Sequence, residues 1–214
     1  MMQLIGRFGS PYARRVGVTM QIYGLPYEHQ ALTPFGDEKA EVRRHNPLGR
    51  VPALVLDSGE TIVESATIID CLDEIAGPEA ALTPASGPER RAVLKRVSVA
   101  LGAMDKLVSA LYEHHLRPKE FTYRPWVDMC DRQVTEGFQW LDSQLDADWF
   151  VGDRMTQADV TVAVFWQFGC GKRPNFMNRM GCARLQALSD RLADTAAFRN
   201  CPEGEGLPKG LALG

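Results

Sequence analysis

The stretch NPLGRVPALVLDSGETIVES, residues 46–65, decides the fold of the first third of the chain. It holds two short apolar runs, residues 51–56 and 61–63, which predict strands. The sequence DSGE between them is typical of a tight turn, so the two runs form a hairpin. A helix follows at once, because apolar side chains recur every three or four positions from residue 64 to residue 76.

The Val51-Pro52 pair at the start of the hairpin is unusual, because proline cannot donate a hydrogen bond to a sheet. A cis peptide bond there would leave the backbone N–H and C=O of Val51 free to pair with an extended ligand. An ordinary edge strand that begins at a trans proline explains the same pattern. The sequence alone leaves both interpretations open.

Glu64 and Ser65 lie where the second strand of the hairpin ends and the helix begins. Unpaired backbone N–H groups and the helix dipole favour an anion at such a position, for example a carboxylate. A structural interpretation also fits, in which Ser65 caps the helix and Glu64 compensates the dipole.

The residues upstream of the hairpin add a strand–helix–strand unit. Residues 3–7 and 27–32 predict strands, and residues 11–23 between them carry apolar side chains at helical spacing. A loop segment then leads to the hairpin. Together the elements predict an α/β domain over residues 1–78, in which a βαβ unit and a ββα unit share one small mixed sheet.

After this domain the chain predicts helices only. The proline- and alanine-rich residues 79–88 are expected to form a linker, residues 89–200 a helical bundle and residues 201–214 an irregular tail. Two apolar stripes predict long helices that pack antiparallel. They consist of Val93, Val97, Ala100, Met104, Leu107 and Leu111, and of Cys130, Val134, Phe138, Leu141 and Leu145.

One segment of the bundle gives conflicting signals. Val160, Val162 and Val164 alternate as in a strand, whereas Thr156 and Asp159 have the spacing of a helix capping box. We expect a helix that ends near Gly169, because the capping pattern includes a hydrophobic staple.

Composition excludes several classes of protein. A net charge of −3 at pH 7 over 214 residues argues against an electrostatic nucleic-acid surface. No apolar run approaches the length that a membrane span needs, and the N-terminal residues lack the pattern of a signal peptide. We therefore expect a cytoplasmic protein that binds neither nucleic acid nor membrane.

Cysteines and histidines give no metal or disulfide pattern. The five cysteines are scattered and odd in number, and His114 and His115 are adjacent, so they point in different directions on a helix. No phosphate-binding loop, G-x-S-x-G or G-x-G-x-x-G motif is present either. We expect reduced thiols and no metal.

Four motifs together carry a resemblance to a known family. SPYARRV from Ser10, NPLGRVPAL from Asn46, E-S-x-x-I from Glu64 and the Thr156-x-x-Asp159 box stand in the order and spacing of cytosolic glutathione S-transferases. The resemblance covers essentially the whole chain and is nearest to serine-type bacterial members. It implies a thioredoxin-like N-terminal domain followed by an all-α C-terminal domain, and a homodimer.

The resemblance also implies a glutathione site. The backbone of Val51 would pair with the cysteinyl unit, with Pro52 in the cis form, while Ser65 would bind the γ-glutamyl carboxylate and Glu64 would face the amino group. For the glycyl carboxylate, the candidates are Arg50 and His45.

Ser10 corresponds to the catalytic hydroxyl of the family. From the sequence alone it caps the helix that starts at Pro11; by resemblance it donates to the glutathione thiolate, which then attacks a small electrophile. Tyr12 is an alternative donor. Arg14 is a candidate for adding positive charge behind the thiolate, although we expect a solvated side chain there. Serine rather than cysteine at position 10 disfavours the thiol-transferase and dehydroascorbate-reductase branches.

Two other functions fit the same motifs, namely a non-catalytic binding or regulatory protein with this fold and a glutathione-dependent disulfide reductase. The sequence does not identify the electrophile. Three aromatic residues of the helical domain are candidates for lining its pocket: Tyr112, Phe165 and Trp166.

Overall fold

A four-stranded mixed sheet is the centre of the first part of the computed structural model, which describes residues 1–204. The strands are β1 (Met2–Ile5), β2 (Tyr27–Gln30), β3 (Ala53–Val55) and β4 (Thr61–Val63), in the order β2-β1-β3-β4. β1 pairs with β2 in parallel, and the other two pairs are antiparallel. This confirms the predicted α/β domain with its βαβ and ββα units.

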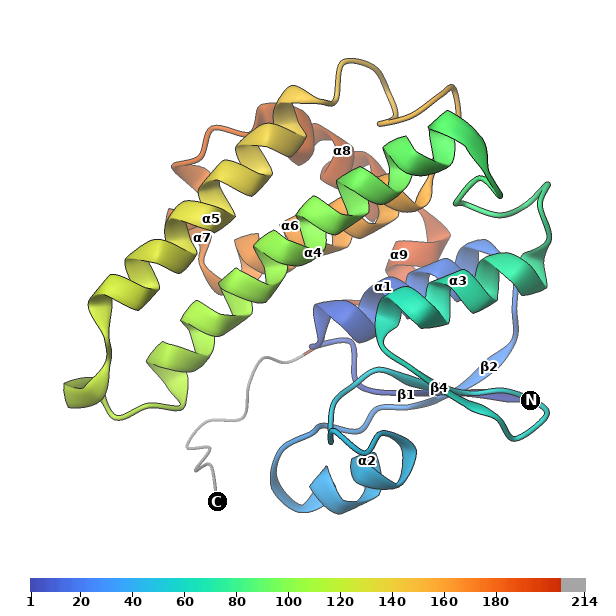
Figure 1. The fold of residues 1–214 in the computed structure, drawn as a ribbon, viewed down its shortest axis with the longest axis horizontal. Coiled ribbons are helices and arrows are strands. Elements are labelled where there is room, and N and C mark those ends of the chain that lie inside the picture. Colours follow the sequence, from blue (N-terminus) through green and yellow to red (C-terminus); the bar gives the residue numbers. More distant parts are fainter. Residues whose placement is uncertain (205–214) are drawn as a thin grey trace. The chain divides into compact units, whose positions relative to one another are not determined.

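Two helices, α1 (Pro11–Ile22) and α3 (Ser65–Ala76), pack together on one face of the sheet (Figure 1). On the other side, a short 3₁₀ turn η1 (Gly36–Glu38) leads into α2 (Lys39–His45), in a region predicted to be a loop. α2 escaped prediction because Val42 is its only fully buried residue, so it has no apolar stripe.

The register of the strands is set by side chains that face the core. Leu4 pairs with Leu54 across β1 and β3, and both side chains are fully buried. A shift by one residue would turn these leucines away from the core, so the pairing is strongly specified. The neighbouring ladder, between β3 and β4, pairs Ala53 with Val63, which fixes the register between the two strands of the hairpin.

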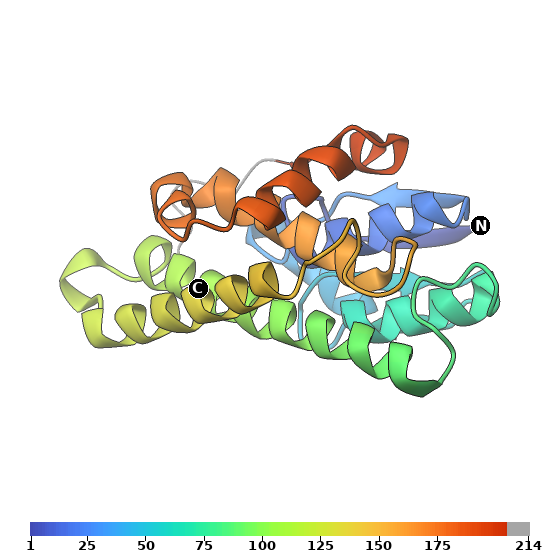
Figure 2. The ribbon, with the colours of Figure 1, turned by 90° about the horizontal axis from the view of Figure 1, so that it is seen from above.

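The second part of the chain is helical among residues 86–191. Its long helices α4 (Gly87–His115) and α5 (Arg124–Ser143) lie side by side and antiparallel, as Figure 2 shows, with a 3₁₀ turn η2 (Lys119–Phe121) between them. All residues of the two predicted apolar stripes are buried. Among residues 1–204, none of the helices combines the length and the apolar character that crossing a bilayer needs. The remaining helices are α6 (Gln157–Lys172), α7 (Pro174–Asn178) and α8 (Ala183–Ala193).

α6 explains the strand-like alternation of valines. Val160, Val162 and Val164 are all fully buried, because this helix is surrounded on nearly every side, so its sequence shows no amphipathic period. Its start has the predicted capping box between Thr156 and Asp159. The helical interpretation of this segment is therefore confirmed.

The chain divides into two compact units at boundaries that differ from those expected. Among the described residues, the first unit comprises Met1–Ala85 and 192–204, and the second comprises 86–191. α4 already begins within the expected linker, and α9 (Ala196–Asn200) packs on α1 in the first unit instead of ending the helical domain. Of the tail expected over 201–214, the last ten residues lie outside the described part.

Candidate functional site

Ser10 lies between the end of β1 and the start of α1. Its backbone is extended, with φ −89° and ψ 120°, and its Oγ accepts a hydrogen bond from the Ala13 amide at 3.4 Å. This confirms the predicted cap. Since the cap uses a lone pair of the hydroxyl and not its proton, the O–H of Ser10 remains able to donate to a ligand.

Gly6 brings the segment before β3 against the first turn of α1. A Cβ added to Gly6 would lie 2.8 Å from the Val51 Cβ and 3.2 Å from the Ala13 Cβ, and its φ is +128°, so only glycine fits. The amide of Ala13 is the group that Ser10 caps. Val51 and the cap of α1 therefore meet at one corner of the first unit.

The Val51–Pro52 peptide bond is cis, in agreement with what the family resemblance implies. Because β3 begins only at Ala53, Val51 lies outside the sheet ladder. Antiparallel pairing of Ala53 with Val63 also places Val51 and Ser65 at the same open end of the hairpin. The end of β1, the segment before β3 and the start of α3 thus converge at one edge of the sheet.

Asn46 holds the loop that carries Val51. It is almost fully buried, its Nδ2 donates to the Arg50 carbonyl at 3.0 Å, and its Oδ1 accepts from the Leu48 amide at 3.0 Å. We assigned this residue no role from the sequence. The Asn-Pro dipeptide, typical of a turn in which the amide side chain bonds the backbone two residues on, was the available signal.

The start of α3 differs from the expected cap. Glu64, not Ser65, is the capping residue, and with φ 67° and ψ 126° it is the one non-glycine residue with positive φ among residues 1–204. Ser65 is the first helical residue and is only 2% exposed, and its hydroxyl forms no hydrogen bond within the described chain. No side chain of residues 1–204 caps this helix. Its first amides and the Ser65 hydroxyl are therefore left for a ligand.

Charged side chains flank this edge. Arg50 Nη1 lies 3.7 Å from Glu64 Oε1, and both side chains are about half exposed. His45, at the end of α2, lies with Nε2 3.7 Å from Glu41 Oε1. The structure thus brings Arg50 next to Glu64, while His45 is held by its own helix.

Arg14 is buried, so the expectation of a solvated arginine was wrong. Only 5% of it is exposed, and its Nε donates to the Cys201 carbonyl at 2.8 Å. Burial lowers the pKa of Arg14, and the Glu203 carboxylate nearby opposes this shift. Burial also lowers the pKa of Arg15, to about 10, and the partly buried Tyr12, one turn away, opposes this shift.

The aromatic residues proposed to line an electrophile pocket are placed differently from one another. Tyr112 on α4 is 38% exposed. Phe165 is fully buried, and Trp166 packs edge-on against Phe138 and donates from Nε1 to Gln186 Oε1 at 2.9 Å. Phe165 and Trp166 are thus part of the helical core, and Tyr112 is the one of the three candidates whose side chain is exposed.

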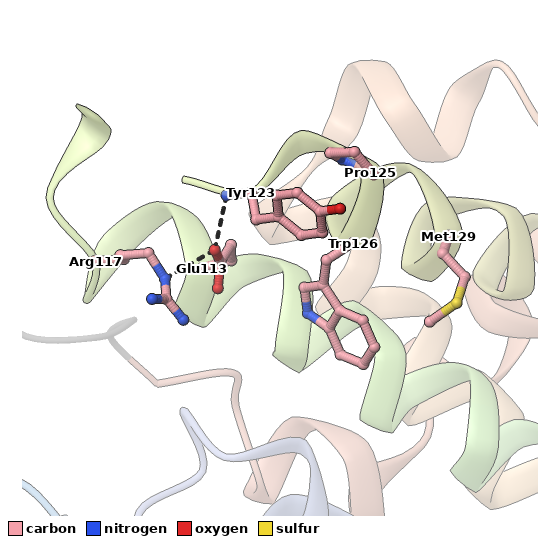
Figure 3. Close-up of a pocket in the computed structure, with 6 residues that line it drawn as sticks. All are labelled: Glu113, Arg117, Tyr123, Pro125, Trp126 and Met129. Atoms are coloured by element: carbon pink, nitrogen blue, oxygen red, sulfur yellow. Dashed lines mark hydrogen bonds and ion pairs between the residues drawn. The ribbon is translucent and has the colours of Figure 1, made fainter. Parts of the chain in front are cut away.

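The second unit contains a hollow that the sequence did not indicate, at the end where α4 passes into α5 (Figure 3). Its volume is about 360 Å³. At its base Glu113 accepts hydrogen bonds from the Tyr123 amide at 3.0 Å and from Arg117 Nε at 2.8 Å, which lowers the pKa of this carboxyl. The lining residues are Glu113, Arg117, Tyr123, Pro125, Trp126 and Met129.

Comparison with known families agrees with the geometry of both units. The N-terminal domain of glutathione S-transferases matches residues 4–80, and the C-terminal domain of the same enzymes matches residues 103–194. A maleylacetoacetate isomerase from Pseudomonas aeruginosa is 31% identical over 168 residues, which cover 74% of this chain and 77% of that protein. A match to glutathione S-transferase U8 of Arabidopsis thaliana, 26% identical, spans only about a third of each protein.

Solved structures extend the similarity to nearly the whole length. A glutathione S-transferase from Methylobacterium radiotolerans, in complex with glutathione sulfonate, has a TM-score of 0.87 at 29% identity and covers 97% of this chain and 98% of its own. Another, from Methylobacillus flagellatus with glutathione bound, has a TM-score of 0.89 at 25% identity over 95% and 100% of the two chains. With its four-stranded thioredoxin-like unit and its helical unit, the chain belongs to the cytosolic glutathione S-transferase superfamily.

Proposed function

We propose that this protein is a glutathione transferase that activates the glutathione thiol at Ser10 for attack on a small electrophile. The observation that carries the proposal is the convergence, at one edge of the sheet, of the Ser10 cap, the backbone of Val51 and the uncapped start of α3. Each group is incomplete within the described chain in a way that a tripeptide with a thiol and two carboxylates would complete.

Recognition of glutathione follows from the chemistry of these groups. The γ-glutamyl carboxylate accepts from the Ser65 hydroxyl and the first amides of α3, where the helix dipole favours an anion. Glu64 faces the γ-glutamyl ammonium group. The backbone of Val51 pairs with the cysteinyl unit as an added strand would. For the glycyl carboxylate, Arg50 and His45 remain the two candidates.

Catalysis follows from stabilising the thiolate. A free thiol has a pKa of about 8.5 and is mostly protonated at neutral pH. Donation from Ser10 Oγ to the sulfur, close to the positive end of α1, favours the anion; a pKa lower by about two units corresponds to roughly 2.7 kcal/mol. The proton leaves to solvent, the thiolate forms a carbon–sulfur bond with the electrophile, and a leaving group departs with its electron pair.

The test compares wild type with Ser10→Ala by calorimetric titration with glutathione and by conjugation of chlorodinitrobenzene. We expect retained glutathione binding and a rate at pH 7 about 25-fold lower, because a thiol pKa of about 8.5 instead of about 6.5 reduces the thiolate fraction from about three quarters to about 3%. Ser58→Ala is the matched control, because the exposed Ser58 hydroxyl also accepts a backbone amide, from Glu60 at 3.3 Å. No binding at millimolar glutathione would overturn the proposal, and unchanged turnover would move the activating role to Tyr12.

A second candidate function is suggested by the 31% identity to a maleylacetoacetate isomerase. In an isomerisation the same thiolate adds to a conjugated double bond and leaves again after rotation, so glutathione is regenerated. Measuring glutathione consumption against product formation distinguishes the two: a transferase consumes one glutathione per product, whereas an isomerase consumes none.

We also propose a cytoplasmic homodimer as the working form. Glutathione and thiols remain reduced in the cytoplasm, and all five cysteines of this chain are free thiols. Sedimentation analysis measures the oligomeric state directly, and a monomer at micromolar concentration would refute the dimer.

A further inference from the structure

One face of α1 is covered by the C-terminal segment of the same unit. Arg14, Gly17 and Gln21 follow one another at spacings of three and four residues, so they form a single stripe along the helix. Asn200 Nδ2 donates to Gln21 Oε1 at 3.0 Å at one end of this stripe. From there the chain runs along α1 toward its first turn.

Arg14 is the polar anchor of that contact. Its Nε donates to the Cys201 carbonyl at 2.8 Å, and its guanidinium lies 5.7 Å from the centre of the buried Phe198 ring. The charge of Glu203 attracts it as well. An arginine with 5% exposure has lost nearly all its water. These contacts replace part of that hydration and hold the segment in one place, while Nη1 has no hydrogen-bond partner among residues 1–204.

The Cys201 side chain fixes the segment from the other side. Its Sγ lies 3.7 Å from Tyr27 Oη. It also lies against α1 at Gly17, where an added Cβ would be 3.3 Å from the sulfur and 2.5 Å from the Phe8 ring. Cys201 is therefore held between α1 and β2.

At Gly204 the segment lies directly against the turn that carries Ser10. A Cβ added to Gly204 would lie 2.9 Å from the Gly9 amide nitrogen and 3.5 Å from the Phe8 carbonyl carbon. These are the two residues before Ser10. Phe8 itself is fixed by stacking on His29, with ring centroids 4.0 Å apart.

We propose that Arg14 is a positioning residue for Ser10: by binding the Cys201 carbonyl it seats residues 201–204 against Phe8–Gly9 and so holds the serine hydroxyl in the direction of the glutathione sulfur. The proposal rests on the proposed function of Ser10. Its physical reason is that the cap bond of Ser10 is long, at 3.4 Å, and so holds the hydroxyl weakly. A donor that loses its fixed direction stabilises the thiolate less.

The sharpest test is Gly204→Ala, which places a methyl group where the Gly9 amide leaves no room and pushes the segment off the turn. The readout is the pH titration of the bound glutathione thiolate, followed by its ultraviolet absorbance, with glutathione affinity measured in acid, where the thiol is protonated. We expect an apparent thiol pKa about one unit higher, from about 6.5 to about 7.5, hence about threefold less thiolate at pH 7, with unchanged affinity in acid. Gly102→Ala on α4 is the control, because an added Cβ meets nothing within 4 Å there.

Arg14→Met and Arg14→Lys give an independent test through the anchor. We expect the methionine variant to raise the thiol pKa as Gly204→Ala does. The lysine variant should raise it less, because an ammonium also donates to a carbonyl. A lower melting temperature with a wild-type thiolate titration in Gly204→Ala and Arg14→Met would overturn the proposal and leave a purely structural anchor. If Ser10→Ala itself titrates like wild type, the proposed function of Ser10 fails first, and the two failures are thereby distinguished.

Discussion

The helices α6 and α3 begin in opposite ways. At the start of α6, Asp159 accepts hydrogen bonds from the Thr156 amide at 2.7 Å, the Thr156 hydroxyl at 2.8 Å and the Phe150 amide at 2.9 Å, and it is fully buried. At the start of α3, no side chain within residues 1–204 caps the helix, and the backbone of Glu64 lies in a region that favours glycine.

This difference separates a structural helix start from one that we propose to bind a ligand. The chain satisfies the polar groups at α6 by itself, so the box contributes stability and has nothing to offer a ligand. At α3 the chain keeps a strained residue and open amides, an arrangement that costs stability and persists where a ligand uses it. Substitutions at the two starts should therefore change different measured quantities.

Asp159→Ala should give the largest effect. It leaves three buried donors without an acceptor, and we expect a loss of about 3 kcal/mol in the free energy of unfolding, measured by urea denaturation. Asp153→Ala, at an exposed position nearby, is the control and should change it by less than about 0.5 kcal/mol. A loss below about 1 kcal/mol for Asp159→Ala would contradict a self-sufficient capping box.

Ser65→Ala should act on binding instead of stability. We expect the dissociation constant of glutathione to rise about tenfold, which is about 1.4 kcal/mol, with the free energy of unfolding unchanged within about 0.5 kcal/mol. Thr156→Ala is the counterpart at α6 and should lose about 1 kcal/mol of stability while binding glutathione normally. Equal stability losses in both variants would mean that Ser65 is structural and would remove the contrast.

Glu64→Gly should give the smallest effect and the opposite sign for stability. Glycine adopts a φ of 67° without strain, and after subtracting its greater freedom in the unfolded chain we expect a gain of about 1 kcal/mol. Glutathione affinity should fall several-fold, because the variant lacks the carboxylate that we propose to face the glutathione ammonium group. Gly24→Ala, at φ 64° with open space around it, measures the reverse change and should lose about 1 kcal/mol. No gain in Glu64→Gly would show that the backbone there is unstrained.

Sequence patterns predicted the turns, two helix caps and the helices with a periodic apolar face. The hairpin, the α1 cap at Ser10, the capping box of α6 and the apolar seams of α4 and α5 are local or periodic, so they were accessible. α2 was missed because a helix with one buried residue leaves no period. The burial of Arg14 was missed because its partner Cys201 is 187 residues away along the chain.

The sequence predicted which residues belong to the candidate site better than it predicted how they are arranged. Ser10, Val51 and Glu64-Ser65 were recognised as motifs. The residue that caps α3, however, is decided by the backbone angle of Glu64, which cannot be predicted from its residue type. Phe165 and Trp166 look like pocket residues in sequence because they are aromatic, but α6 is enclosed on nearly every side and buries them. Burial of a helix all round leaves no polar face from which its orientation can be read.

The return of residues 192–204 to the first unit determines the order in which the ribosome can complete the protein. Residues 86–191 are contiguous, so the second unit has all its sequence as soon as that stretch is synthesised. The first unit starts earlier but receives its last piece only after residues 86–191 have been synthesised. Until then the Arg14 side chain lacks the Cys201 carbonyl, and the unit that begins first is the one finished last.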